Sequence, residues 1–314
     1  MERVRIESLS SLGWPPSAVT IGNFDGVHLG HRTLVAAAVD RARSGGGWAV
    51  VLTFDPHPAR VLRPDRAPAA LTTLAQKEEL LAGLGVDRLA VLPFDARVAA
   101  LDAEAFAREV LVGVLGARDV VVGESFRFGR GREGDSQGLA VLGERLGFEV
   151  RAIPPVLSGG EPVSSSRVRH ALARGDVGAA RALLGRSYFV DASVVRGDGR
   201  GRAIGVPTAN LEPDNEVLPA RGVYAARCRT PDGRWSDAVV NLGHRPTFGG
   251  GPVTAEAHLL DFAGDLYGAR LRLEFHARLR GERRFDGASA LVAQILQDIT
   301  EARALLSGSG GERL

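Results

Sequence analysis

Residues 20–32 read Thr20-Ile-Gly-Asn-Phe-Asp-Gly-Val-His-Leu-Gly-His-Arg32, between a short apolar run and a helix-like segment. The glycines permit a tight turn from strand to helix and a close approach of a ligand to the backbone. His28 and His31 are three positions apart, so they share one face of the helix once it has begun. Imidazoles above the amino end of a helix are suited to stabilise negative charge on a phosphate. The spacing also fits a capped turn with solvated histidines, or half of a metal site that lacks a nearby third ligand.

The segments on either side of this turn alternate between strand and helix signals. Short apolar runs predict strands at residues 18–21, 49–54, 89–93, 120–123 and 148–153. Amphipathic runs predict helices at residues 30–44, 74–84, 103–115 and 137–146, with two shorter ones at 166–174 and 177–184. This alternation indicates a doubly wound parallel sheet covered by helices on both faces. In such sheets ligands bind at the carboxyl ends of the strands, which is where the turn lies.

After residue 184 the hydrophobic period changes. Residues 270–279 alternate strictly between polar and apolar side chains, which is typical of a half-buried antiparallel strand. Similar runs occur at residues 188–195, 223–229, 238–242 and 254–262, and glycine- and proline-rich turns separate them. The pattern predicts a small closed antiparallel barrel. A helix that packs on this barrel is predicted by an apolar stripe formed by Leu291, Ile295, Ile299, Ala302 and Leu306.

The change in period places a domain boundary near Gly185. We therefore expect an α/β domain over residues 1–185, a barrel domain over residues 186–306 and a disordered tail over residues 307–314. Apolar residues make up 45% of the chain and charged residues 24%, the balance of an ordinary soluble protein. The formal net charge of +2 is too small to indicate a nucleic-acid partner, and no apolar run is long enough to span a membrane.

The cysteine and lysine content bounds the chemistry further. A single cysteine, Cys228, excludes an internal disulfide, and we expect a cytoplasmic protein. Lys77 is the only lysine, and all the other basic residues are arginine. It lies between Gln76 and Glu78, so the chain has no Walker-type phosphate loop, which needs a Gly-Lys pair. Phosphate must then be bound by backbone amides, histidine, arginine or a metal ion.

A second glycine-rich stretch reads Gly197-Asp-Gly-Arg-Gly-Arg-Ala-Ile-Gly-Val-Pro-Thr-Ala-Asn-Leu211. Thr208 and Asn210 are two positions apart and face the same way on an extended chain. Both offer hard oxygen ligands, which suit Mg²⁺ that bridges the phosphates of a nucleotide. Taken alone, a glycine-rich loop is usually a hairpin connection. As a flap that closes over phosphates, this one would contact them through Gly199, Gly201 and Gly205.

The string from Gly22 to His31 resembles the His-x-Gly-His signature of the nucleotidyltransferase superfamily. In its extended form it is similar to the amino-terminal module of bacterial bifunctional riboflavin kinase/FAD synthetases. Later blocks that resemble this module are Thr53-Phe-Asp-Pro-His-Pro58, Val122-Gly-Glu-Ser-Phe-Arg-Phe-Gly-Arg-Gly-Arg132 and Val163-Ser-Ser-Ser-Arg-Val-Arg169. The resemblance implies a Rossmann-like nucleotidyltransferase domain with His28 and His31 as catalytic residues. It implies nucleotide or phosphate contacts from Gly22, Asn23, Phe24, Gly30, Ser164, Ser165, Ser166 and Arg169.

Some of these positions have a physical reading of their own, and two depart from the family pattern. Residues 164–166 read as a helix amino cap with free amides, and Arg169 as a bidentate partner for an oxyanion. Ser166 stands where the family has threonine, and Ser125 where it commonly has asparagine or aspartate. We expect His57, at the carboxyl end of a strand, and Ser125 to contact flavin or nucleotide, although capping of a turn explains His57 nearly as well.

The second half of the chain resembles riboflavin kinase motifs in their expected order. The blocks are Pro207-Thr-Ala-Asn-Leu211, Leu218-Pro-Ala-Arg-Gly-Val-Tyr224, Asn241-Leu-Gly-His-Arg-Pro-Thr-Phe248, Ala255-Glu-Ala-His-Leu-Leu-Asp-Phe262, Asp265-Leu-Tyr-Gly268 and Leu279-Arg-Gly-Glu-Arg-Arg-Phe285. In that family a barrel glutamate activates the ribityl hydroxyl, and Glu256 matches it. Val206 replaces the usual phenylalanine and removes no ligand. The resemblance covers residues 18–303 and implies a six-stranded antiparallel riboflavin kinase barrel with a carboxyl-terminal helix.

The implied function is two successive reactions that use ATP and Mg²⁺. In the carboxyl-terminal domain riboflavin and ATP give FMN and ADP, and in the amino-terminal domain FMN and a second ATP give FAD and diphosphate. A nucleotidyltransferase for another metabolite leaves residues 207–211 unexplained, and a flavin-binding regulator has no need of intact His28 or Glu256. A class I aminoacyl-tRNA synthetase also carries a lysine-containing loop, which the surroundings of Lys77 do not resemble. The sequence leaves open the oligomeric state and whether FMN passes directly between the sites.

Overall fold

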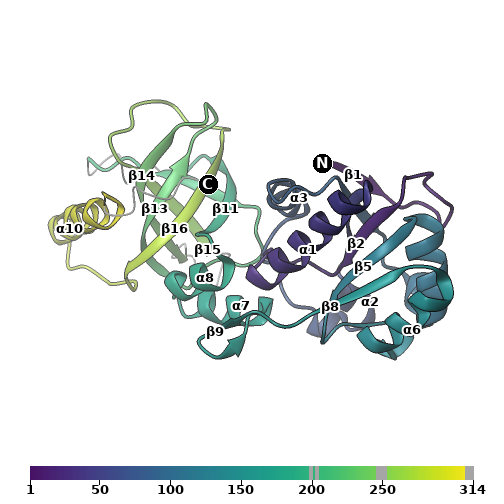
Figure 1. Ribbon diagram of the computed structural model, residues 1–314. Helices are drawn as coiled ribbons and strands as arrows, with labels where there is room; N and C mark the ends of the chain where they lie inside the picture. The colour runs from purple at the N-terminus through teal and green to yellow at the C-terminus, as the bar shows by residue number, and fades with distance from the viewer. Residues whose placement is uncertain (198–200, 202–204, 245–252, 308–314) are drawn as a thin grey trace. The chain divides into compact units, whose positions relative to one another are not determined.

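The computed structural model describes residues 1–197, 201, 205–244 and 253–307 (Figure 1). It comprises two compact units, Met1–Ser164 and Ser165–Leu314. Gly199 and residues 308–314 of the expected tail lie outside the described residues. Within the described part of the chain, every helix is too short or too polar to cross a membrane.

The first unit is built on a six-stranded parallel sheet. In spatial order its strands are β1 (Glu2–Arg5), β4 (Arg88–Leu92), β3 (Trp48–Phe54), β2 (Ser17–Ile21), β5 (Ala117–Gly123) and β8 (Glu149–Ile153). All neighbouring strands pair in parallel, which confirms the prediction. From β2 the chain adds β3 and β4 on one side and then continues with β5 on the other side of β2. Ligands of open parallel sheets bind where the strand order reverses in this way, at the carboxyl ends of β2 and β5.

Helices cover both faces of this sheet (Figure 1). Helices α1 (Leu29–Gly45) and α3 (Leu74–Ala82) pack on one face, whose core includes Val51 of β3. On the other face, whose core includes Val50, pack α5 (Ala103–Ala105), η2 (Phe106–Val114) and α6 (Ser136–Leu146). The connections hold α2 (Pro58–Leu62), η1 (Pro64–Arg66), α4 (Ala96–Ala100), β6 (Arg127–Phe128), η3 (Arg130–Arg132), β7 (Gly134–Asp135), β9 (Leu157–Ser158) and β10 (Glu161–Pro162).

Two local features differ from the sequence-based expectation. Strand β1 was not expected, because its residues are charged and mostly exposed, and it pairs only with β4 at the edge of the sheet. The helix expected over residues 103–115 is a short α-helix followed by a π-helix, η2. The wider turn of η2 still buries Phe106, Val110 and Val114, so the apolar pattern that predicted a helix is satisfied.

The second unit contains a closed barrel, as predicted. Around the barrel the strands follow the order β11 (Tyr188–Val195), β12 (Ala209–Pro213), β15 (Val253–Leu259), β14 (Trp235–His244), β13 (Gly222–Arg229) and β16 (Arg270–Arg280). Every pairing among them is antiparallel. Helix α10 (Ala288–Ser307) packs on the barrel with Ala302 and Leu306 against Val223, Ala225 and Val239.

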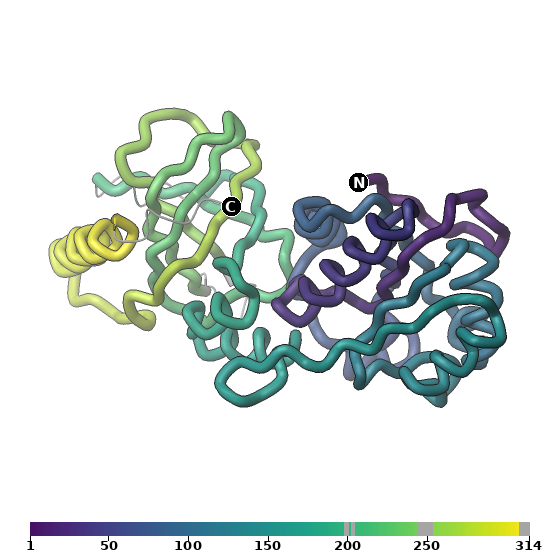
Figure 2. The backbone as a smooth tube through the Cα atoms, in the orientation of Figure 1, coloured from purple at the N-terminus to yellow at the C-terminus, as the bar shows by residue number. Residues whose placement is uncertain are grey.

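Helices α7 (Ser165–Ala173) and α8 (Val177–Leu184) belong to the same compact unit as the barrel (Figures 1 and 2). The carbonyl of Leu172 accepts a hydrogen bond from the backbone N–H of Ala220 at 2.8 Å. The carbonyl of Arg174 accepts one from Nη1 of Arg278 at 3.3 Å. The compact unit around the barrel therefore begins before the functional boundary that we place near Gly185.

Candidate functional site

The turn between β2 and α1 has a constrained backbone. Phe24 and Val27 have positive φ angles of 47° and 41°, which side chains other than glycine rarely adopt. The carboxylate of Asp25 accepts hydrogen bonds from the backbone N–H groups of Leu71 at 2.9 Å and Thr72 at 3.2 Å. Backbone strain of this kind persists only where the surroundings enforce it, and it is concentrated at functional sites.

His28 is the amino cap of α1, and the capping hydrogen bond defines the tautomer of its ring. Its Nδ1 accepts the backbone N–H of His31 at 3.3 Å, so the hydrogen of the neutral ring is on Nε2. The two imidazoles stack with their centroids 3.6 Å apart. A Cβ at Gly30 would lie 3.2 Å from the His28 ring, which explains the glycine at that position. Likewise, a Cβ at Gly22 would lie 3.3 Å from the ring of Phe24.

Both imidazoles are held in the neutral form. Burial lowers the pKa of His28 to about 4, and the side chain is only 7% exposed. Burial also lowers the pKa of His31 well below its usual value, and the charges of His28 and Lys77 lower it further. Neutral imidazoles stabilise a phosphate through N–H donors rather than through positive charge.

A buried lysine, which the sequence suggested only as evidence against a Walker loop, supports this turn. Lys77 is 9% exposed, and its Nζ donates to Oγ1 of Thr53 at 3.3 Å. The Thr53 hydroxyl in turn donates to the carbonyl of Asn23 at 3.2 Å. Asn23 is one of the residues predicted to contact the nucleotide.

The other predicted residues of the first site follow the carboxyl ends of strands of the sheet or lie in the second unit. His57 follows β3 and caps α2, because its Nδ1 accepts the backbone N–H of Ala59 at 3.0 Å. Ser125 follows β5 and is exposed. The carbonyl of Val163, just before Ser164, lies 3.8 Å from the position of a Cβ at Gly30. Three predicted residues lie in α7, within the second unit, and their grouping with the histidines stays a prediction: Ser165, Ser166 and Arg169.

In the barrel, the register brings the predicted kinase residues together. Asn210 of β12 is directly opposite Glu256 of β15, and Glu256 is directly opposite Asn241 of β14. Directly paired residues of neighbouring strands point to the same face of a sheet. Asn210, Glu256 and Asn241 therefore form one polar row across three strands. The pairing of Asn241 with Glu256 was missed, because sequence alone does not give the register.

His258, which was not among the site residues predicted from the sequence, holds the segment before β12 in place. Nδ1 of His258 lies 2.8 Å from the carbonyl oxygen of Pro207, so Nδ1 is the donor. His258 is two residues beyond Glu256 and therefore on the same face of β15. The hydrogen bond ties Pro207, and with it Thr208, to the strand that carries Glu256.

Two glycines of the glycine-rich stretch, Gly197 and Gly201, lie close to the two predicted metal ligands. A Cβ at Gly197 would overlap the carboxamide of Asn210. A Cβ at Gly201 would lie 2.9 Å from Oγ1 of Thr208, and Gly205 has a φ of 82° that favours glycine. Three of these positions therefore need glycine for reasons of space or backbone conformation.

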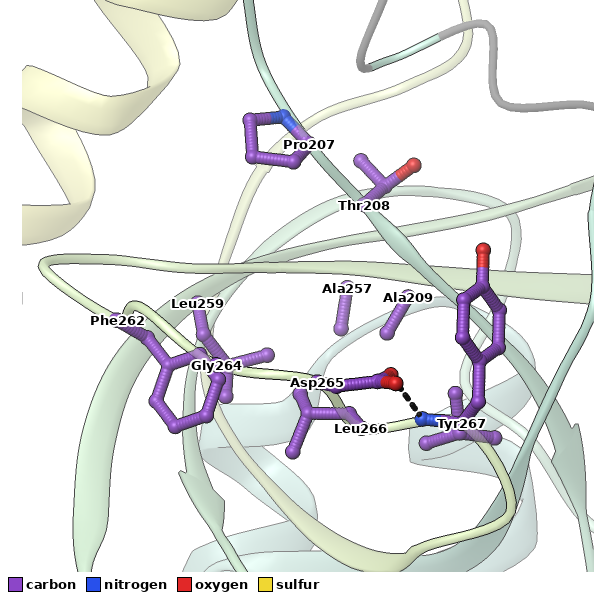
Figure 3. Close-up of a pocket in the computed structure, with 11 residues that line it drawn as sticks. Pro207, Thr208, Ala209, Ala257, Leu259, Phe262, Gly264, Asp265, Leu266 and Tyr267 are labelled. Atoms are coloured by element: carbon purple, nitrogen blue, oxygen red, sulfur yellow. Dashed lines mark hydrogen bonds between the residues drawn. The ribbon is translucent and has the colours of Figure 1, made fainter.

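A pocket opens beside Thr208 (Figure 3). Pro207 and Thr208 lie along one side of it, and Leu259 and Tyr267 are among the residues that line the rest. The side chain of Asp265 accepts the backbone N–H of Tyr267 at 2.9 Å, which closes the turn below the pocket. A lining that mixes apolar side chains with a hydroxyl and a carboxylate suits a flat aromatic ring attached to a polar group.

The donor set near this pocket fits Mg²⁺ bound together with a nucleotide. Within the part of the chain that the structure describes, there is no group of three or more His, Cys, Asp or Glu that could hold a metal ion. Thr208 and Asn210 supply neutral oxygens, and Mg²⁺ is commonly bound by few protein ligands together with phosphate oxygens and water. The metal would thus be held jointly with ATP rather than by the protein alone.

Two family models match separate parts of the chain. A model described as FAD synthetase matches residues 12–167, and a model described as riboflavin kinase matches residues 184–306. A protein named bifunctional riboflavin kinase/FMN adenylyltransferase from Escherichia coli (strain K12) is 40% identical over 298 residues, which is 95% of each chain. Its namesake from Pseudomonas fluorescens is 42% identical over 291 residues, 92% of this chain and 93% of the relative.

A solved structure has the same arrangement of elements. The crystal structure of a protein described as a macrolide-efflux protein from Streptococcus pneumoniae superposes with a TM-score of 0.88 and is 31% identical. The match covers 96% of this chain and 98% of that one. That description differs from the names of the two relatives above, and we use the likeness for the fold.

Proposed function

The chain belongs to the family of bifunctional riboflavin kinase/FMN adenylyltransferases, and we propose that it makes FMN from riboflavin and then FAD from FMN. The observation that carries this function is that both family models match one chain, each over the part that holds the corresponding candidate site. The turn with His28 and His31 lies within the first match, and the polar row with Glu256 lies within the second.

In the kinase reaction, the carboxylate of Glu256 takes the proton from the terminal ribityl hydroxyl of riboflavin. The oxygen then forms a bond to the γ-phosphorus of ATP, the bond from that phosphorus to the β,γ-bridging oxygen breaks, and ADP leaves. Thr208 and Asn210 would hold Mg²⁺, which neutralises charge on the phosphates. We place the adenine of this ATP in the pocket beside Thr208, because the pocket adjoins the residues that we assign to the phosphates.

In the adenylyltransferase reaction, a phosphate oxygen of FMN forms a bond to the α-phosphorus of a second ATP, and diphosphate leaves. The nucleophile is already anionic, so the site has to position two phosphates and stabilise charge rather than remove a proton. Nε2–H of His28 and the neutral ring of His31 donate to phosphate oxygens at the start of α1. We assign Ser164, Ser165, Ser166 and Arg169 to the remaining phosphate oxygens.

The location and the domain boundary are also part of this proposal. We infer that the enzyme works in the cytoplasm, where ATP and riboflavin are both present, and that its substrates are riboflavin, FMN and ATP. We keep the functional boundary near Gly185. Helix α7 belongs to the same compact unit as the barrel, although it precedes this boundary in the chain.

The test is incubation of the protein with riboflavin, ATP and Mg²⁺, followed by chromatographic separation of riboflavin, FMN and FAD over time. We expect FMN to appear first and FAD to follow, with one ATP consumed for each step. FMN supplied alone should be converted to FAD. Flavin binding without ATP consumption would instead identify a flavin-binding regulator, and turnover of a different phosphorylated metabolite would identify another nucleotidyltransferase.

A further inference from the structure

Lys77 is an unusual residue for its position. An ammonium group is costly to bury unless partners compensate it, yet this side chain is only 9% exposed. Burial lowers its pKa, and the carboxylates of Asp25 and Asp55 offset part of that effect. A residue placed at such a cost has either a structural or a functional reason, and its contacts identify which groups depend on it.

The hydrogen bonds of Lys77 have a fixed direction. Lysine only donates, so Oγ1 of Thr53 must accept from Nζ, and the hydroxyl hydrogen is left for another acceptor. That acceptor is the carbonyl of Asn23, at 3.2 Å. Thr53 is fully buried, so water does not compete for its hydroxyl. The ammonium therefore orients Thr53 so that it holds the backbone just before Phe24, the first of the residues with a strained φ.

The charge of Lys77 also acts on His31. His31 lies close enough for that charge to disfavour a proton on its ring, in addition to the effect of burial. The groups that face this ring from the surrounding elements include His28, which lowers the pKa of His31 in the same way. A neutral His31 keeps an acceptor and a donor nitrogen, whereas a protonated one would have two donors.

The identity of the residue adds an argument from the chain itself. Lys77 is the only lysine, whereas every other basic position is occupied by arginine. A guanidinium is a larger, planar fork with five N–H donors, and burying it requires more acceptors than the single hydrogen bond that the Lys77 ammonium donates to Thr53. A compact ammonium fits where the arginine that dominates this sequence does not.

We propose that Lys77 is a positioning residue of the adenylyltransferase site, whose buried ammonium holds the turn before His28 in place through Thr53 and Asn23. The role of this turn in FAD formation rests on the proposed function. The contacts of Lys77 with Thr53, and of Thr53 with Asn23, do not depend on that function.

The main test compares Lys77→Met with the wild-type protein. Methionine keeps the length of the apolar stem and removes the charge and the donors. We expect kcat for FAD formation from FMN to fall at least about tenfold, since small displacements of catalytic groups cost up to about 100-fold. The KM for FMN should change far less. FMN formation by the barrel should stay at the wild-type rate, and the thermal unfolding of the first unit, followed in the same sample, shows whether that unit is folded.

A second readout is independent of activity. We expect the NMR titration of the His31 ring to shift to higher pH in Lys77→Met, because a neighbouring positive charge is lost. The signal is assigned by its absence in a His31→Gln variant. Arg3→Met is the matched control: Arg3 pairs with Glu78 on the same helix α3, its side chain is 45% exposed, and the variant loses the same unit of charge. It should leave both readouts unchanged.

Two further variants separate the hydrogen bond from the charge. Thr53→Val keeps the ammonium at position 77 and removes the hydrogen bond to the carbonyl of Asn23, whereas Lys77→Arg keeps the charge but replaces the compact ammonium by a larger group. We expect FAD formation to fall in both, with the His31 titration near that of the wild type. Thr53→Val, which is nearly isosteric, keeps the test available if Lys77→Met does not fold.

The inference is overturned if folded Lys77→Met forms FAD at the wild-type kcat. It is also overturned if Thr53→Val and Lys77→Met only lower the melting temperature while kcat per folded molecule is kept. If the wild-type protein does not convert FMN to FAD, the proposed function fails instead. The His31 titration still tests the placement of Lys77 in that case.

Discussion

The ring of His28 and the backbone of His31 are joined by a hydrogen bond in which Nδ1 accepts the His31 N–H at 3.3 Å. The acceptor nitrogen carries no hydrogen, so Nε2–H is the one donor of the neutral His28 ring. The same contact caps α1 at its amino end. A single side chain thus caps the helix and, in the proposed function, supplies a donor for a phosphate, and these two roles are separable by mutation.

Replacement of His31 by alanine should suppress FAD formation while riboflavin phosphorylation survives. His31 lies in the first compact unit, and the residues assigned to the kinase reaction lie in the second. Loss of one donor to a developing oxyanion costs about 100- to 1,000-fold, so FAD formation should fall by at least about 100-fold. The two half-reactions are measured separately, with riboflavin and with FMN as the starting flavin. Loss of FMN production in folded His31→Ala protein would contradict the assignment.

Replacement of His28 by asparagine should separate the cap from the donor. Asparagine is among the best amino caps, so the His28→Asn variant keeps the start of α1 but has no Nε2–H. We expect thermal stability close to that of the wild type and a large loss of FAD formation. His28→Ala should lose both, with about 1 kcal/mol less stability from the missing cap. Melting temperatures of the two variants measure the capping role of His28, and their rates of FAD formation measure its donor role. Full activity in His28→Asn would rule out the donor role.

A buried histidine in the barrel should make stability depend on pH. His276 has both ring nitrogens buried without a partner among the described residues, and its nearest carboxylate is Oε2 of Glu274 at 3.9 Å. Its pKa is lowered from 6.5 to about 4, chiefly by burial and in addition by the charges of Arg227 and Arg181, which Asp237 partly offsets. In the unfolded chain the ring titrates near its ordinary value.

The direction of this pH dependence is set by the unfolded chain, which binds a proton at His276 at a higher pH than the folded protein does. Between pH 6.5 and 4 the unfolded chain is protonated at His276 and the folded protein is not, so stability is lost as the pH falls through this window. The whole shift corresponds to about 3 kcal/mol, and nothing is lost above pH 6.5. Urea unfolding at pH 7 and pH 4.5 should show a smaller loss for His276→Phe than for the wild type. An equal loss of stability in the wild type and in His276→Phe would show that His276 is not the cause.

The packing of α7 and α8 affects which fragment folds best. A riboflavin kinase of residues 186–314 has all six strands and α10, and we expect it to form FMN. Leu172, Leu183 and Leu184 are buried in the second unit, however, and a fragment that begins at 186 lacks all three. A buried leucine contributes about 1.5–3 kcal/mol, so the fragment that begins at Ser165 should melt at a clearly higher temperature. Equal melting temperatures would show that the two helices contribute nothing to the barrel.

The sequence predicted the parts of this fold that depend on local patterns. Apolar runs that alternate with amphipathic helices identified the parallel sheet, and strict alternation over residues 270–279 identified a barrel strand. Both patterns depend only on residues close in the chain. Strand β1 escaped notice because its stability comes from pairing with β4, which is distant in the chain, and not from an apolar pattern of its own.

The candidate sites show the same limit. Motifs identified His28, Glu256, Thr208 and Asn210, because each lies in a characteristic string. The pairing of Asn241 with Glu256 depends on the register of two strands, and a local pattern carries no information about it. Lys77 was visible as the only lysine, but its role depends on a contact with Thr53 of β3, which is remote from it in the chain.

Glu256 lies between Asn210 and Asn241 in a row across three strands, so it can be replaced by a neutral side chain of the same shape. Glu256→Gln keeps the size and hydrogen-bonding capacity but does not accept a proton at neutral pH. General-base assistance is worth about 100- to 10,000-fold, so FMN formation should fall by at least about 100-fold.

The same variant discriminates a base from a structural carboxylate. If Glu256 is the base, riboflavin should still bind, because that binding does not require proton transfer, and supplied FMN should still become FAD, because His28, His31 and Arg169 are unchanged. If Glu256 only stabilises the barrel, the melting temperature should fall while FMN formation per folded molecule stays close to normal. Both half-reactions and the melting temperature are measured on one preparation. Near-normal FMN formation by folded Glu256→Gln would end the assignment, whatever its stability.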